Sequence, residues 1–71
     1  MYNGWKNYET WNVALWINSD ENLYRLSQEC KNYAEFLQAS ELEQTPDGVS
    51  LYDKKLSIRE LNRVFKENHI D

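Results

Sequence analysis

Few side chains of this chain have the types and the spacing that catalysis requires. His69, the only histidine, lies close to the C-terminal end, where chain ends fray, so we predict a solvated end residue and not a general base. Cys30, the only cysteine, falls on the apolar face of a predicted helix and is predicted to be a buried structural thiol. Neither residue has a partner in sequence that would make it a nucleophile–base pair.

Two acidic pairs are the remaining candidates for a metal site. Asp20 with Glu21, and Glu41 with Glu43, offer carboxylates to a hard cation, but neither pair has the ligand spacing of a calcium loop. Acidic residues are also common at helix starts because of the helix dipole. The two glycines are too far apart to form a phosphate-binding loop. The sequence therefore predicts a protein that is not an enzyme, with no metal and no cofactor.

Aromatic residues are concentrated in the stretch NYETWNVALWINSDENLY, residues 7–24. Trp11 and Trp16 fall in a predicted helix that is apolar nearly all round, and we predict them to be core, with a surface offered to a partner as the alternative. Tyr2 and Trp5 precede this helix, and they either fold back as a lid on the core or stand exposed as interface anchors. Tryptophan and tyrosine are enriched at binding hot spots.

These residue types predict a protein-binding site made of N-terminal aromatic residues and their flanking acids. Acidic side chains favour a protein partner with a basic surface. Self-association through an uncovered tryptophan face stays open, which would make the protein a homo-oligomer. The predicted site residues are Tyr2, Trp5, Tyr8, Glu9, Trp16, Asp20 and Glu21.

Length and composition place this site in one small domain, residues 1–71. The chain is 41% hydrophobic and 14% aromatic, which is enough to form a core, and its single cysteine cannot form an internal disulfide. The longest apolar run, residues 11–17, is far short of the ~20 residues that a membrane span needs. No signal-peptide pattern is present at the start. We expect a cytoplasmic protein with no membrane partner.

The charge is unevenly distributed along the chain. The net charge of −4 divides into −5 for residues 1–50 and +1 for residues 51–71. An acidic domain is repelled by phosphate backbones, so nucleic-acid binding is the alternative and not the first expectation. That alternative would use a modest basic face, which Glu60 and Glu67 are expected to weaken by pairing with Arg63. Its residues are Lys54, Lys55, Arg59, Arg63 and Lys66. DNA mimicry by surface carboxylates ranks lower, because Arg25 and Lys31 interrupt the acids.

Three helices are predicted, at about residues 8–18, 20–39 and 57–68. Asn7 caps the first, and either Ser19 or Asp20 caps the second. An i, i+3, i+7 pattern predicts one continuous apolar face for the second helix, with the opposite face solvated. The residues of the apolar face are Leu23, Leu26, Cys30, Tyr33, Ala34 and Leu37.

A loop with turn residues separates the second and third predicted helices. Thr45–Pro46–Asp47–Gly48 has the composition of a tight turn, and no strand-like run is available to pair with residues 49–52. Ser57 and Glu60 have the spacing of a capping box, flanked by Leu56 and Leu61 at the positions of a hydrophobic staple. The predicted fold is all-α: a small three-helix domain with a Pro/Gly turn between the second and third helices.

The aromatic stretch also resembles part of a known protein family. NYETWNVALWINSDENLY resembles the N-terminal signature of a family of small, uncharacterised proteins of phages, other mobile elements and some bacteria. PDGVSLYDKKLSIRELN, residues 46–62, is similar to the later part of some members. The resemblance implies a phage-like context and no particular chemistry. Together with the aromatic residues, it suggests a small acidic module that inhibits or modulates a host protein.

Overall fold

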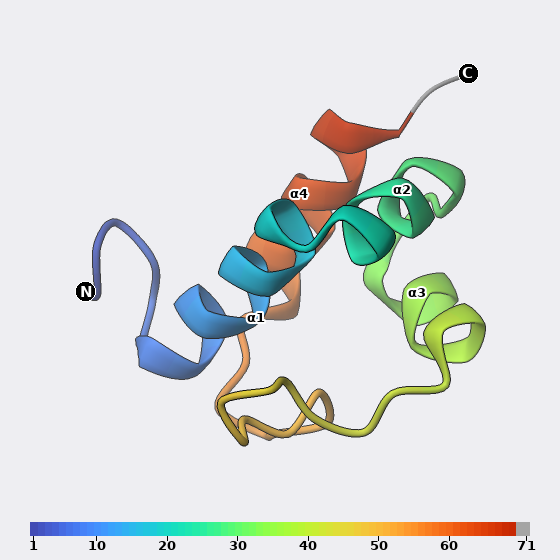
Figure 1. Ribbon diagram of the computed structural model, residues 1–71. Helices are drawn as coiled ribbons and strands as arrows, with labels where there is room; N and C mark the ends of the chain where they lie inside the picture. The colour runs from blue at the N-terminus through green and yellow to red at the C-terminus, as the bar shows by residue number, and fades with distance from the viewer. Residues whose placement is uncertain (70–71) are drawn as a thin grey trace.

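The computed structural model describes residues 1–69 and consists of four helices joined by short connections and one long loop (Figure 1). The helices are α1 (Tyr8–Ser19), α2 (Glu21–Glu29), α3 (Tyr33–Ser40) and α4 (Ile58–Asn68). Residues 1–69 contain two isolated β-bridges and no strand, so the predicted all-α class is confirmed. The predicted number of three helices is wrong. Within the same residues, no helix has the length and apolar character needed to cross a bilayer.

The additional helix arises because the predicted helix 20–39 is broken between Cys30 and Asn32. The Asn32 side chain accepts a hydrogen bond from the backbone N–H of Glu35, and the Glu35 carboxylate accepts one from the N–H of Lys31, both at 2.9 Å. This reciprocal arrangement starts a new helix. The break turns α3 away from the axis of α2, and Ala34, predicted on the shared apolar face, is exposed.

The junction of α1 and α2 follows the predicted capping. Asn7 caps α1 by accepting from the N–H of Thr10 at 2.9 Å, as predicted. Of the two candidates for the second cap, Asp20 is the one used, because its carboxylate accepts from the N–H of Leu23 at 3.0 Å. Asp20 also ends α1, where its own N–H donates to the carbonyl of Trp16. A single residue therefore separates the two helices.

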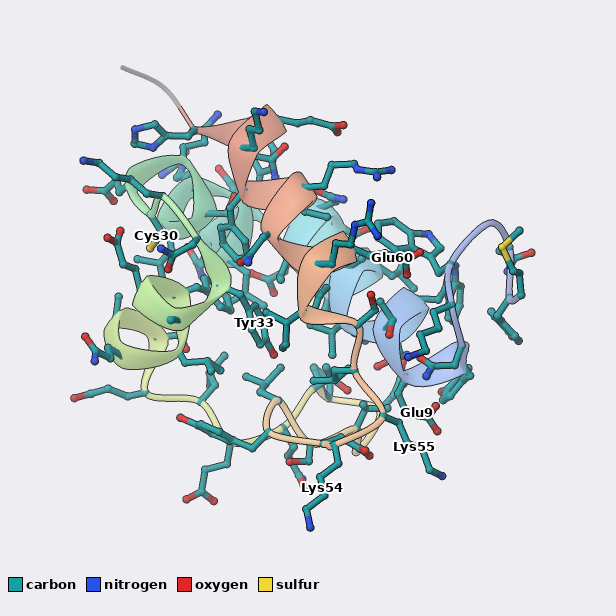
Figure 2. All side chains as sticks on the ribbon, turned by 180° about the vertical axis from the view of Figure 1, so that it is seen from behind. Glu9, Cys30, Tyr33, Lys54, Lys55 and Glu60 are labelled. Carbon is teal, nitrogen blue, oxygen red and sulfur yellow. The ribbon has the colours of Figure 1, made fainter. Side chains whose placement is uncertain are left out.

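The core lies between α1, α3, α4 and the long loop. The rings of Tyr33, Phe36 and Phe65 contact one another, with centroids 5.2 to 6.2 Å apart. The Tyr33 hydroxyl donates to the carbonyl of Leu51 at 2.7 Å, and Figure 2 shows this side chain between α3 and α4. Burial raises the pKa of Tyr33 well above its ordinary value, so the hydroxyl stays protonated as a donor. The buried apolar residues are Val13, Ala14, Ile17, Cys30, Tyr33, Phe36, Val49, Leu51, Leu56, Leu61, Val64 and Phe65.

The loop between α3 and α4 is part of the folded structure. It passes beneath α1 and returns to the start of α4 (Figure 1). The N–H of Thr45 donates to the carbonyl of Val49 at 2.8 Å, and the N–H of Leu51 donates to that of Glu43 at 2.9 Å. Residues 43–45 thus pair with residues 49–51, for which the sequence had offered no partner. Val49 and Leu51 are thereby placed in the core.

The start of α4 forms only half of the predicted capping box. The Ser57 hydroxyl accepts from the N–H of Glu60 at 3.3 Å, as predicted. The Glu60 carboxylate, however, accepts from the N–H of Lys6 at 2.8 Å, and the N–H of Ser57 donates to the hydroxyl of Thr10 at 3.0 Å. The Glu60 carboxylate and the Ser57 N–H, which would bind each other in a complete capping box, therefore bind residues 6 and 10 instead.

We expect Ser57→Ala to lower the free energy of unfolding by about 1 kcal/mol, because the first turn of α4 loses its cap. Urea denaturation followed by circular dichroism measures this difference. A denaturation midpoint identical to that of the wild type would show that α4 does not depend on this cap.

Candidate functional site

The first residues of the chain form a two-residue hairpin. The N–H and carbonyl groups of Tyr2 and Trp5 exchange two hydrogen bonds of 2.7 Å, and Asn3 and Gly4 between them have φ values of +47° and +87°. Positive φ at both central positions defines a type I′ turn, for which Asn-Gly is the preferred pair. The sequence YNGW therefore contains the signal for this hairpin, which was not among the predicted elements. The turn folds Tyr2 back toward α1.

Three aromatic rings gather where this hairpin meets α1. The ring centroids are 5.4 Å apart for Tyr2 and Tyr8, 5.0 Å for Tyr2 and Trp11, and 5.7 Å for Tyr8 and Trp11. Tyr2 and Tyr8 are 39% and 40% exposed, and Trp11 is half-buried. Leu15, 38% exposed, continues the same face of α1 one turn further. We refer to Tyr2, Tyr8, Trp11 and Leu15 as the aromatic surface.

The Trp5 ring, among the described residues, makes no ring contact with the aromatic surface. It is half-buried and packs against the core, as the lid alternative predicts. Beside it is a shallow pocket of about 230 Å³, lined by Gly4, Trp5, Glu60, Arg63, Val64 and Glu67. Trp5 therefore closes the core on the side of α4, and its packing accounts for its presence.

A buried polar contact joins the start of α1 to the segment that precedes α4. The Thr10 hydroxyl donates to the Asn7 carboxamide oxygen at 2.6 Å and accepts from the N–H of Ser57 at 3.0 Å. The Asn7 amide donates to the carbonyl of Lys55 at 2.6 Å. Thr10 is fully buried, so its hydroxyl has no water to replace these partners. Asn7 and Thr10 thus have a structural role.

A second polar contact holds the long loop against α1. Buried Asn12 accepts from the Thr45 hydroxyl at 2.7 Å and donates to Asp47 Oδ2 at 2.8 Å. The Trp16 indole N–H donates to the same oxygen at 2.9 Å. Asp47 thus fixes the tip of the loop to two residues of α1. We call Asn12, Trp16, Thr45 and Asp47 the loop latch.

The prediction that Trp11 and Trp16 are core residues is wrong. Both side chains are half-buried, and α1 contributes Val13, Ala14 and Ile17 to the core instead. When a helix is apolar nearly all round, its residue pattern does not indicate which side faces the interior. Trp16 is used by the loop latch, and Trp11 belongs to the aromatic surface.

The predicted acidic site residues do not gather at the aromatic surface. Asp20 caps α2, and Glu21 forms an i, i+4 ion pair of 2.6 Å with Arg25, as the spacing predicts. Glu9 is half-buried in the first turn of α1, on the side where Figure 2 shows Lys55. Of the seven predicted residues, the structure brings Tyr2 and Tyr8 together. Trp11 and Leu15 complete the surface and were missed as site residues, although their i, i+4 spacing was readable.

Residues 1–41, more than half of the chain, match the Family of unknown function (DUF7249). The chain belongs to this family. The resemblance of its N-terminal signature to an uncharacterised family is thereby confirmed. No curated protein and no solved structure matches the chain. In this DUF7249 protein the matched part holds α1 to α3 and the whole aromatic surface, whereas Ser57 and Asp47, which fix α1 in place, lie outside it.

The other candidates for chemistry lie outside the aromatic surface of this DUF7249 protein. Within residues 1–69, no three His, Cys, Asp or Glu side chains are placed to hold a metal ion. Cys30 is buried, as predicted, and burial, with smaller contributions from Glu35 and Glu29, raises the pKa of its thiol and disfavours the thiolate. His69 ends α4 by donating its backbone N–H to the carbonyl of Phe65 at 2.8 Å, and it is half-buried, which is less solvated than predicted.

The predicted basic face is exposed. Lys54 and Lys55 extend from the loop (Figure 2), and Arg59, Arg63 and Lys66 lie on the outer side of α4. Among the described residues of this DUF7249 protein, Glu21 with Arg25 is the one ion pair, so the expected pairing of Arg63 with Glu60 and Glu67 is wrong. The positively charged side chains of α4 are therefore not paired with carboxylates of the described chain.

Asp47 gives the loop latch a pH dependence. Hydrogen bonds from Asn12, and then from Trp16, hold the pKa of this exposed carboxyl below its ordinary value of about 3.9. Because the pKa is lower in the folded state, the stabilisation is fully present above the ordinary value. It is lost as the pH falls through the lowered pKa.

We expect the Trp16 indole N–H resonance to be constant from neutral pH down to about pH 5 and to shift as Asp47 takes up a proton in stronger acid. Nuclear magnetic resonance of ¹⁵N-labelled protein follows this signal directly. The Asp47→Asn protein is the control, and its resonance should not titrate. A wild-type resonance that titrates at or above the ordinary aspartate value would contradict the latch geometry.

Proposed function

We propose that this protein binds another protein through the aromatic surface formed by Tyr2, Tyr8, Trp11 and Leu15. One observation carries the proposal: three rings in mutual contact stay partly exposed on one face, beside an exposed leucine. None of the four residues belongs to the buried core. Tyrosine and tryptophan in such clusters are the residue types that most often anchor protein interfaces.

The other signature residues support this assignment by contrast. Asn7, Thr10, Asn12 and Trp16 each have a hydrogen-bonded partner in the fold, so packing and capping account for them. Within the described residues, the side chains of the aromatic surface form only one hydrogen bond, a long one of 3.4 Å from the Asn12 amide to the Tyr8 hydroxyl. The rings of this surface are also held in place, by a helix on one side and a type I′ hairpin on the other, which lowers the entropy cost of binding.

The expected partner has a basic surface. Residues 1–50 carry a net charge of −5, and this acidity would speed encounter with a positively charged protein. The resemblance to proteins of phages and mobile elements suggests that the partner is a host protein, which this small cytoplasmic module inhibits or modulates. In this proposal the protein acts by occupying a surface and carries out no reaction of its own.

A second candidate function is association with nucleic acid through the basic face. The observation in its favour is that Arg59, Arg63 and Lys66 have no carboxylate within ion-pair distance in the described structure. Glu60 and Glu67 nevertheless lie among them, and the acidic first half of the chain repels phosphate. This function therefore ranks below protein binding, and DNA mimicry ranks lower still.

Affinity capture with matched variants tests the proposal. Immobilised wild-type protein should retain a specific protein from a lysate of the cell in which the chain is expressed. Tyr8→Ala and Trp11→Ala should lose at least nine-tenths of it, because anchor truncation costs about 2 kcal/mol. Tyr52→Ala is the control, since Tyr52 is 61% exposed and lies outside the aromatic surface. Equal retention by all four proteins would contradict the proposal.

Binding to random duplex DNA separates the second candidate from the first. If protein binding is the function, affinity for DNA should stay weak even at low salt. Strong affinity that falls steeply with salt, and that is lost in Arg59→Ala and Arg63→Ala, would favour nucleic-acid association.

A further inference from the structure

The loop latch places a carboxylate next to the aromatic surface. The Asn12 side-chain amide lies 2.8 Å from Asp47 Oδ2 and 3.4 Å from the hydroxyl of Tyr8, so this amide bridges the acid and the ring. Asn12 and Trp16 both bind Oδ2. The other oxygen, Oδ1, has no hydrogen-bond partner among residues 1–69. Asp47 is an exposed residue, so its carboxylate is available to a partner on the side of Tyr8 that carries the hydroxyl.

No positively charged side chain of the described residues binds to these rings or to this carboxylate. Glu21 with Arg25 is the only ion pair among residues 1–69, and within these residues the rings of Tyr2, Tyr8 and Trp11 form ring–ring contacts and no cation–π contact. Aromatic faces attract cations, and a carboxylate within reach of the same cation strengthens the attraction. Both groups are thus free to act on an incoming positive group.

The shape of the site favours a planar cation. The three ring centroids are only 5.0 to 5.7 Å apart, so the rings touch and enclose no cage in which an ammonium group would fit. A guanidinium can instead lie flat on an exposed ring face while its edge donates hydrogen bonds to a carboxylate. The ammonium group of lysine has no such flat face and edge.

We propose that the aromatic surface binds an arginine side chain of the protein partner. The arginine lies on the Tyr8 ring, which Tyr2 and Trp11 support, and it also binds the carboxylate of Asp47. The inference rests on the proposed function and makes it more specific, because it names the group on the partner that the aromatic surface recognises. The acidic character of the first half of the chain is complementary to such a partner.

Titration with short peptides of defined charge tests the inference. The probes are acetylated hexa-arginine and acetylated hexalysine at equal ionic strength, followed by ¹⁵N resonances of the ¹⁵N-labelled protein. Hexa-arginine should shift the indole N–H signals of Trp11 and Trp16 and bind at least threefold more tightly than hexalysine. Asp47→Asn should weaken hexa-arginine binding at least fivefold while its amide oxygen still accepts from Asn12 and Trp16.

Glu43→Gln removes the same charge from the same loop at an exposed residue and is the control, with an expected change of less than twofold. If Asp47→Asn fails to fold, Tyr2→Leu decides the question, since it keeps the apolar bulk and removes one ring; it should weaken hexa-arginine binding at least twofold. Equal binding of both peptides, or equal losses in Asp47→Asn and Glu43→Gln, would overturn the inference. A captured partner that Tyr8→Ala loses and Asp47→Asn retains would overturn arginine recognition and leave protein binding intact.

Discussion

Phe65→Ala should leave most of the protein unfolded at room temperature. Phe65 is fully buried, and its ring centroid lies 5.2 Å from that of Phe36 and 6.0 Å from that of Tyr33. Truncation of a buried phenylalanine costs about 3 to 5 kcal/mol, which approaches the whole stability of a domain of this size. Far-ultraviolet circular dichroism and urea denaturation measure the loss of helix and of cooperative unfolding.

Ile58→Ala is the matched control for this variant. Ile58 lies on the same helix and is 47% exposed, so its truncation should change the free energy of unfolding by no more than about 1 kcal/mol. A Phe65→Ala protein as stable as Ile58→Ala would place the core elsewhere than between α3, α4 and the loop.

Asn12→Leu should be the second most damaging substitution, at about 2 to 4 kcal/mol. The new side chain is similar in size but accepts nothing from Thr45 and donates nothing to Asp47. The buried Thr45 hydroxyl is then left without its acceptor, which costs more than the lost hydrogen bond alone. Trp16 fluorescence should also change, because the loop no longer holds Asp47 over the indole N–H.

Asn22→Leu is the comparison for this prediction, because Asn22 is exposed on α2 and should tolerate the same change within about 0.5 kcal/mol. Equal stability of the two variants would mean that the loop latch does not stabilise the fold. In that case the hydrogen bond of Trp16 to the loop would not explain why this tryptophan is present.

The sequence predicted the features that depend on neighbouring residues. The caps at Asn7, Asp20 and Ser57 lie within three residues of the groups they bind, so their spacing is visible in the chain. The break before α3 was equally local, in the Asn32 and Glu35 pair. It was missed because apolar residues continue the i, i+3 pattern through it.

The remaining structure depends on partners far apart in the chain. Thr10 binds Ser57 and Asn12 binds Thr45 across separations of 47 and 33 residues, and no single sequence indicates such pairs. They determine which side of α1 is covered by the loop and therefore which side keeps its aromatic residues exposed. That is why the sequence identified Tyr2 and Tyr8 as site residues but assigned Trp11 to the core.

In our proposal, the N-terminal signature combines residues that hold the fold with residues that bind a partner. The most direct test is the dissociation constant of Tyr8→Ala for the partner that the wild type captures, measured together with the melting temperature of the variant. We predict roughly thirtyfold weaker binding, equivalent to about 2 kcal/mol, with a melting temperature lowered by no more than about 8 °C. Unchanged affinity in a folded Tyr8→Ala protein would contradict this proposal. A Tyr8→Ala protein that fails to fold would also contradict it, because Tyr8 would then be needed for the fold.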